Sequence, residues 1–218
     1  YLYHYARLLK YYFESRGKEK LVSYFDTSSD LMEVAFKKTN INAVPDADII
    51  IFGNVDKLDL FGDQEFEGNG EFMWKTQTVG SKKVMLLGCK FSIWGDLGEY
   101  LIKNLSKTSR FSVFIYIGKL GSLNEGVVPN VHLATGEKSL IDGQEIEWDN
   151  FFRENSLKEG PVLKGVHVTC RSVMDETVSQ VTKLKRIGDF IDPEIGNMAR
   201  ACSKNSKQFS YLHIISDN

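Results

Sequence analysis

The stretch FSVFIYIGKLGSLNEG, residues 111–126, joins a continuous apolar run to a segment that holds three glycines and one lysine, Lys119. An apolar run of this kind predicts a strand that is buried on both faces of a parallel sheet. Glycines at the end of such a strand predict a turn in which a ligand or another segment comes close to the backbone. We therefore expect a binding site near residues 116–126.

The same pattern continues on both sides of this stretch and predicts an α/β protein. Strand-like runs alternate with helical spacing of apolar residues, and residues 54–71, acidic and rich in glycine, predict a loop or hairpin tip. We expect a single domain over residues 1–218, with a central mixed, mostly parallel sheet flanked by helices. The predicted strands cover residues 21–25, 47–53, 82–88, 111–118, 127–135, 162–170 and 209–218, and the predicted helices cover 2–13, 28–39, 94–107, 175–188 and 193–205.

Composition narrows the function classes. The chain has 218 residues, 42% hydrophobic and 26% charged, which suits one soluble domain with a sizeable core. A formal net charge of -2 gives no reason to expect nucleic acid or an anionic membrane as a partner. No apolar run approaches the ~18 residues of a membrane span.

The cysteines and histidines predict no metal or cofactor site. The three cysteines, Cys89, Cys170 and Cys202, are odd in number and too far apart for a disulfide framework or a C-x-x-C pair. This usage predicts a reducing, cytoplasmic compartment. The histidines at 132, 167 and 213 lie scattered in predicted strands and are expected in the core or at sheet edges.

Ligands of parallel sheets bind where the strands end. The predicted ends therefore define the expected site, and the third of them contains the cationic turn. They are Gly53-Asn54, Gly88-Cys89, Gly118-Lys119-Leu120-Gly121, Cys170-Arg171-Ser172 and Ser216-Asp217.

Two carboxyl groups near these ends have two open interpretations each. In GDFIDPEIGNMARA, residues 188–201, Asp192 can cap a helix that begins at Pro193. Glu194 then either complements the helix dipole on the surface or points over the sheet edge and binds ligand hydroxyls. Asp217 either turns the chain or, partly desolvated, acts as a general acid.

Three segments carry a resemblance to a known family. They are YIGKLGSL (116–123), SVMDETVSQVTKLKRIGDFIDPEIGNMA (172–199) and FSYLHIISDN (209–218). In order and spacing they resemble the nucleoside phosphorylase/nucleosidase superfamily, which has a G-[ST]-x-G-like turn, a helix start V-D-M-E and a strand end I-S-D. The resemblance covers roughly residues 82–218, and the first 80 residues match poorly.

The resemblance implies a role for each catalytic candidate. Glu194, at the glutamate of V-D-M-E, would hold the ribose hydroxyls, and Asp217, at the aspartate of I-S-D, would protonate purine N7. Breaking a glycosidic bond leaves a cationic sugar and an anionic base, so a proton donor at the base accelerates the reaction.

The expected binding residues lie at the same strand ends. The turn would cradle the sugar, and the loop after residue 170 would contact the base. These candidates are Gly118, Lys119, Gly121, Ser122, Arg171, Ser172 and Ser216.

The sequence departs from the family at three positions. Pro193 replaces the usual methionine, Lys119 stands where Ser or Thr is common, and Tyr116 replaces an arginine of phosphorolytic members. The usual phosphate site is therefore not intact, which favours hydrolysis. Lys119 is either a solvated lysine or a ligand for phosphate, as the attacking anion or as part of a nucleotide.

Two functions remain open at this point. The first is an enzyme that cleaves the N-glycosidic bond of a purine nucleoside or nucleotide; Asp56 and Glu71 are both open as the group that activates water. The alternative is a non-catalytic sensor or interaction module of the same fold. The resemblance also implies a homo-oligomer, and a helix beyond Asn218, so we expect the natural chain to continue past this residue.

Overall fold

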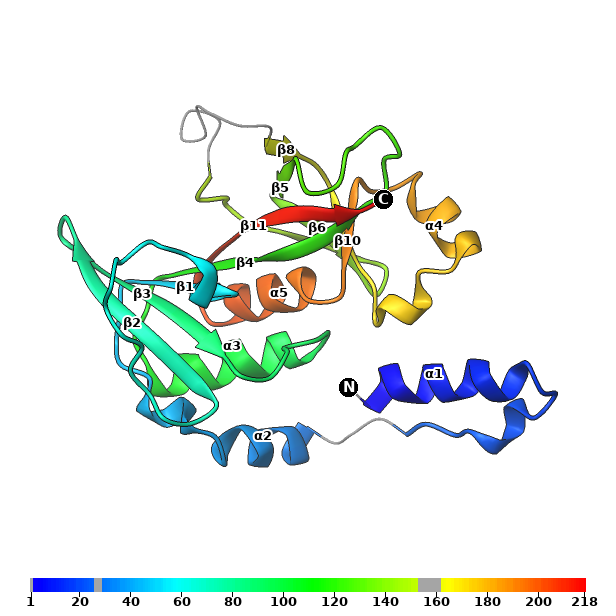
Figure 1. Cartoon of the computed structure of the whole chain (residues 1–218), viewed down its shortest axis with the longest axis horizontal. Helices are drawn as coiled ribbons and strands as arrows, with labels where there is room; N and C mark the ends of the chain where they lie inside the picture. Colours follow the sequence, from blue (N-terminus) through cyan, green and yellow to red (C-terminus); the bar gives the residue numbers. More distant parts are fainter. Residues whose placement is uncertain (1, 26–28, 153–161) are drawn as a thin grey trace.

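The structure, a computed structural model, describes residues 2–25, 29–152 and 162–218 (Figure 1). The described strands form one mixed sheet of eleven strands, and helices pack against it, as the sequence predicts. The helices are α1 (Leu2–Glu14), α2 (Ser29–Lys37), α3 (Leu97–Thr108), α4 (Val178–Leu184) and α5 (Ile195–Lys204), with short 3-10 turns η1 (Glu19–Leu21), η2 (Asn40–Ala43), η3 (Val55–Lys57) and η5 (Val173–Asp175). The strands are β1 (Ile49–Gly53), β2 (Phe72–Val79), β3 (Lys82–Cys89), β4 (Val113–Ser122), β5 (Leu133–Thr135), β6 (Lys138–Ile141), β7 (Gln144–Glu147), β8 (Val162–Lys164), β9 (His167–Thr169), β10 (Phe190–Asp192) and β11 (Gln208–Asp217).

The centre of the sheet is parallel. β1 lies between β3 and β4, and β11 lies on the other side of β4, all running in the same direction. Each contains buried apolar side chains, as expected for strands in the centre of a sheet. β2 pairs antiparallel with β3 and β7 with β6 at the two ends of the strand order, and β10 pairs antiparallel with the last residues of β4.

α3 and α5 pack side by side under this central sheet (Figure 1). Their apolar faces supply fully buried side chains, among them Leu101, Leu105 and Met198. Gly98 permits the close approach, because a Cβ at this position would lie 2.8 Å from Cγ of Met198. This packing fixes the N-terminus of α5, where Glu194 lies, against the loop that precedes α3.

Some predicted elements are wrong. Residues 21–25 contain no strand; residues 127–135 form a strand only in their last three residues, and residues 162–170 form two strands. β2, β6, β7 and β10 were not expected. β10 has three residues and β7 is mostly exposed, so neither carries the continuous apolar signal on which the prediction rested.

The largest correction concerns the glycine-rich turn. β4 continues through Ser122, so Gly118, Lys119 and Gly121 lie within a strand. The ladder with β11 runs past them, with Gly118 opposite His213 and Gly121 opposite Asp217. The two glycines make room for these neighbours, because a Cβ would lie 3.0 Å from Nε2 of His213 and 3.1 Å from Oδ2 of Asp217, respectively.

The N-terminal helix is confirmed, but its apolar stripe is not part of the core. Tyr5, Leu8, Leu9 and Tyr12 of α1 are about half exposed. Figure 1 shows α1 apart from the sheet; apart from the following turn η1, it contacts η5 and loop residues such as Trp94 and Arg171. The expected homo-oligomer stays a prediction. Among the described helices, none is both long and apolar enough to cross a membrane.

Gly53 gives a direct test of the central register. It ends β1 with φ of +135°, and a Cβ there would lie 1.9 Å from the carbonyl oxygen of Ile117. We expect Gly53→Ala to destabilise the fold by more than about 2 kcal/mol, because both the backbone conformation and the contact are forbidden. Gly80→Ala is the control, since Gly80 also has a positive φ but open space around it. Equal shifts of the two melting temperatures would show that this register is wrong.

Candidate active site

The candidate site lies at an opening along one edge of β4. On this edge β1 pairs with β4 only as far as Ile117, and β10 begins to pair at Gly121. Between them, no described strand pairs with residues 118–120 on this side. Because β10 runs antiparallel to β4, the chain after Ile191 passes back along the opening and brings Asp192 and Glu194 beside it. The site therefore lies near the middle of β4 and not at a turn.

Asp192 ends β10 and makes several hydrogen bonds and charge contacts at the corner where β10, the start of α5 and the open edge of β4 meet. Its side chain is buried, and its Oδ1 accepts the N–H groups of Glu194 (3.0 Å) and Ile195 (2.9 Å) at the start of α5. The helix begins at Ile195, with Glu194 and not Asp192 at the N-cap position, two residues later than predicted. Nε2 of His167 lies 3.0 Å from Oδ1. Burial alone would raise the pKa of Asp192, but His167, His213 and the helix amides lower it below its ordinary value.

Glu194 is buried, so the interpretation as a surface acid is wrong. It is 6% exposed, and its Oε1 accepts the N–H of Gly95 at 2.8 Å. Burial, and then the charge of Asp192, raise the pKa of Glu194 well above its ordinary value. Burial therefore favours the protonated form of this carboxyl, which in this structure is bound to the loop before α3.

His213 lies on the other side of β4 and was expected only as a core histidine. It is fully buried, as is His167, so that expectation is confirmed. Its Nε2 lies 3.9 Å from Oδ2 of Asp192, and neither of its ring nitrogens has a hydrogen-bond partner among the described residues. Burial lowers the pKa of His213 to about 4, so the ring is neutral. Its place in the site follows from strand pairing, which local sequence does not reveal.

Asp217 and Ser216 end β11 near the opposite end of the opening. Asp217 is exposed and lies over Gly121, and the Ser216 hydroxyl donates to its Oδ1 and to the carbonyl of Leu120. No hydrogen bond joins Asp217 to Glu194 in the part of the chain that the structure describes. The two catalytic candidates thus flank the opening without contact.

Glu176 lies close enough to Asp217, Asp192 and Asp175 for their charges to raise its pKa, and no motif in the sequence marks it as a site residue. It directly follows η5 and is half-buried. Burial, and then the charges of Asp217, Asp192 and Asp175, raise the pKa of Glu176 to about 7.

Three of the predicted binding residues have other contacts. The Ser122 hydroxyl is used within its own turn, where it bonds to Asn124. Ser172 Oγ accepts the N–H of Met174 and lies 3.0 Å from Nδ1 of His4 in α1. The guanidinium of Arg171 stacks over the ring of Tyr3, 4.2 Å from its centre.

Lys119 keeps an exposed side chain on β4. Strand alternation places it on the same face as Gly121, over which Asp217 lies. A turn of free N–H groups around it is absent, because these residues pair with β11. The predicted phosphate cradle is therefore wrong in form, although the cation is present near the opening.

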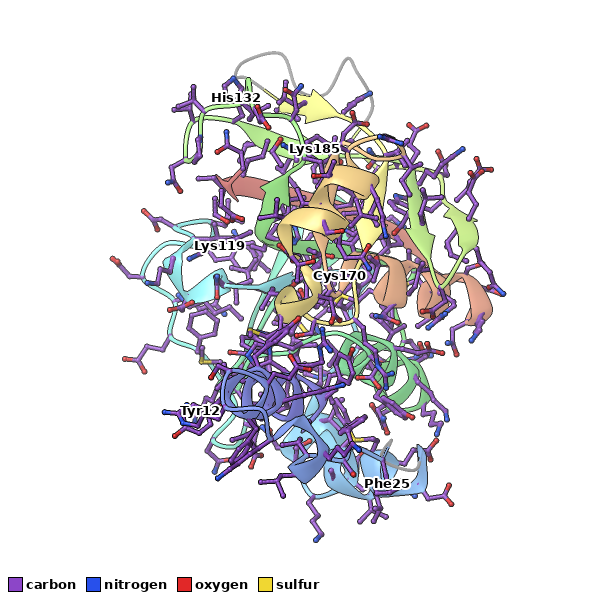
Figure 2. All side chains as sticks on the ribbon, turned by 90° about the vertical axis from the view of Figure 1, so that its right-hand side faces the viewer. Tyr12, Phe25, Lys119, His132, Cys170 and Lys185 are labelled. Carbon is purple, nitrogen blue, oxygen red and sulfur yellow. The ribbon has the colours of Figure 1, made fainter. Side chains whose placement is uncertain are left out.

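α1 covers the segment expected to contact the base. Asp175 of η5 pairs with Nε of Arg7 at 3.1 Å and accepts from the Tyr3 hydroxyl, and His4 contacts the ring of Trp94. Figure 2 looks onto this side of the molecule, with α1 and its Tyr12 below the region of Cys170 and Lys119.

Two hollows lie away from the site, one between Asp46 and Arg110 and one between Asn124 and Lys185. Within the described residues, no group of three or more His, Cys, Asp or Glu side chains is placed to hold a metal ion.

Known structures share this architecture. A purine nucleoside phosphorylase from Toxoplasma gondii superposes with a TM-score of 0.62 at 15% identity, covering 80% of this chain and 78% of that one. This chain has the nucleoside phosphorylase fold. The MTAN of Helicobacter pylori matches with a TM-score of 0.62 at 17% identity, covering 78% and 89% of the two chains. A uridine phosphorylase from Vibrio fischeri matches with 0.63 at 13% identity, covering 78% of each.

These matches confirm the predicted resemblance in its fold. No protein-family model and no curated protein matches the sequence.

Proposed function

We propose that this protein cleaves the N-glycosidic bond of a purine nucleoside or nucleotide, by hydrolysis rather than phosphorolysis. The observation that carries the proposal is the buried carboxyl of Glu194, held at the start of α5 beside the open edge of β4. This is the residue that the family resemblance assigns to the ribose. Solved enzymes of the same fold include purine nucleoside phosphorylases and MTA/SAH nucleosidases.

The charges around the opening support hydrolysis. Asp192 lies beside it, and because its pKa is lowered it carries a negative charge that would repel a phosphate anion. Water is a neutral nucleophile and meets no such repulsion. In the proposed reaction the electron pair of the C–N bond passes to the base, and Asp217 gives its proton to the base. Water adds to the sugar and releases one proton to bulk water, from which the exposed Asp217 is protonated again.

One experiment separates the reaction types. The purified protein is incubated with purine nucleosides and nucleotides, with and without phosphate, and free base is measured. Base released without phosphate supports hydrolysis, and base released only with phosphate supports phosphorolysis. Tight binding without release overturns the enzymatic proposal.

A second candidate function, a nucleoside or nucleotide sensor, is favoured by the contacts that Glu194 and α1 make at the site. Glu194 is already bound to Gly95, and α1 covers residues 171–175. A sensor needs binding with a conformational change but no turnover. It predicts that ligand changes the proteolytic protection of α1 while no base appears over hours.

Lys119→Ala distinguishes a phosphorylated substrate from a plain nucleoside. Lys119 shares a face of β4 with Gly121 and is exposed toward ligand. For a nucleotide we expect kcat/KM to fall about 10- to 100-fold, because a charge-assisted contact to phosphate is lost. For a nucleoside hydrolysed by water we expect less than a threefold change. Lys185→Ala, which removes another surface lysine paired with Glu125, is the control. A similar loss for both substrate types would exclude a phosphate contact by Lys119.

A further inference from the structure

Glu176 is a carboxyl group of this corner to which the proposed function assigns no role. It lies between η5 and α4, beyond the carboxyl end of β9, and its Oε1 accepts a hydrogen bond from the Cys170 thiol at 3.4 Å. The Cys170 backbone N–H in turn donates to the carbonyl of Asp192 at 3.1 Å. Through Cys170, these two contacts join Glu176 to the corner that holds Asp192 and Glu194.

The groups that face Glu176 are acidic on every side. Asp175 comes from its own segment, Asp192 and Glu194 from the start of α5, and Asp217 from the end of β11. Cys170 supplies a neutral thiol, whose pKa burial raises far above its ordinary value. Asp175 differs from the others because Arg7 of α1 pairs with it. Burial and the remaining acids keep a proton on Glu176 up to about neutral pH, since they raise its pKa to about 7.

An independent observation marks the same corner as a place for a polar ligand group. Oδ2 of Asp192 and Nε2 of His213 are both buried, 3.9 Å apart, and have no hydrogen-bond partner among the described residues. Buried polar atoms are nearly always satisfied by protein, water or ligand. The corner next to Glu176 therefore has unused hydrogen-bonding capacity.

We propose that Glu176 binds the purine base as a neutral carboxylic acid and donates a hydrogen bond to a second acceptor atom of the base. The inference rests on the proposed function, in which Asp217 protonates the departing base. One proton is transferred, from Asp217 to a ring nitrogen, while Glu176 keeps its own and shares it. The hydrogen bond draws negative charge from the leaving base, so it strengthens as the C–N bond breaks. Ionised Glu176 has no proton to share and repels the base.

The test compares two substitutions over pH 5.5–8.5. Wild-type kcat/KM should fall as the pH rises through about 7, because Glu176 then loses its proton. Glu176→Gln keeps a donor that cannot ionise, so activity at pH 6 should stay within a few-fold and this fall should disappear. Glu176→Ala should lose about 10- to 100-fold at pH 6. Asp175→Asn is the matched control, because it removes the neighbouring carboxyl and should keep the fall near pH 7.

Binding separates this inference from the proposed function. Calorimetry with adenine and hypoxanthine should show tighter binding at pH 6 than at pH 8.5 for wild type, and equal binding for Glu176→Gln. If nucleosides are cleaved but Glu176→Gln keeps the wild-type pH profile, the inference is wrong and the function stands. If no nucleoside is cleaved but the pH-dependent binding is seen, the role of Glu176 in binding stands and the enzymatic proposal fails. Absence of purine binding at both pH values overturns both.

Discussion

Asp217→Asn is expected to lower the rate of base release on the order of 10²- to 10⁴-fold while ligand affinity changes only a few-fold. Asp217 lies at the exposed end of β11, directly over Gly121. Asparagine has the same shape and keeps an oxygen that accepts from the Ser216 hydroxyl, as Oδ1 of Asp217 does. It cannot deliver a proton to the departing base. The measurement is kcat by release of free base, with affinity by calorimetry.

A matched control for this variant is Asp142→Asn. Asp142 lies in the β6–β7 turn, is largely exposed and has a positive φ that asparagine tolerates. It should leave both rate and affinity unchanged. If Asp217→Asn retains full activity in a protein that cleaves nucleosides, Asp217 is not the acid. The Glu176 variants would then show whether the neighbouring carboxyl has that role.

The central strands could be predicted because their apolar runs are long enough to exclude other structures. β1, β3, β4 and β11 were all found in this way, and with them the parallel centre of the sheet. The glycines of β4 were misinterpreted for a physical reason. Gly118 and Gly121 accommodate the side chains of His213 and Asp217, and a close side chain requires glycine as much as a close ligand does.

The composition of the candidate site could be predicted only in part. Glu194 and Asp217 have recognisable positions at the start of a helix and the end of a strand. His213 and Glu176 do not, because the first reaches Asp192 across β4 and the second reaches Cys170 through the path of a loop. Such neighbours are set by tertiary pairing, which the spacing of residues does not encode. The docking of α1 through Arg7 and Asp175 is another contact of this kind.

Glu194→Gln is expected to lower kcat by about 10²- to 10³-fold and to weaken ligand binding by about tenfold. Glutamine is isosteric and its oxygen can still accept the N–H of Gly95. Positive charge on the sugar lowers the pKa of Glu194 and so favours its ionised form, which stabilises that charge, whereas an amide cannot become negative. The amide also accepts weaker hydrogen bonds from ribose hydroxyls than the ionised carboxyl does. Steady-state kinetics and calorimetry measure the two effects separately.

The pH dependence of stability checks that this loss is chemical and not structural. Burial raises the pKa of Glu194, so the folded state binds this proton more tightly than the unfolded state does. The stability that results from this difference is present at low pH and is lost as the pH rises through the raised pKa. Glu194→Gln should therefore flatten the decline in unfolding free energy above pH 5.

Glu99→Gln, in α3, is the matched control. Burial alone would raise the pKa of Glu99, but Lys204 and Arg200 pair with its carboxylate and lower that pKa. Ionised Glu99 therefore adds to the unfolding free energy at neutral pH, and this stabilisation is lost on acidification. Glu99→Gln should thus lose stability at pH 7 without losing rate. A loss of stability at pH 7 for Glu194→Gln as large as that of Glu99→Gln would mean that Glu194 is ionised in the folded protein, and its assignment as a neutral buried acid would be wrong.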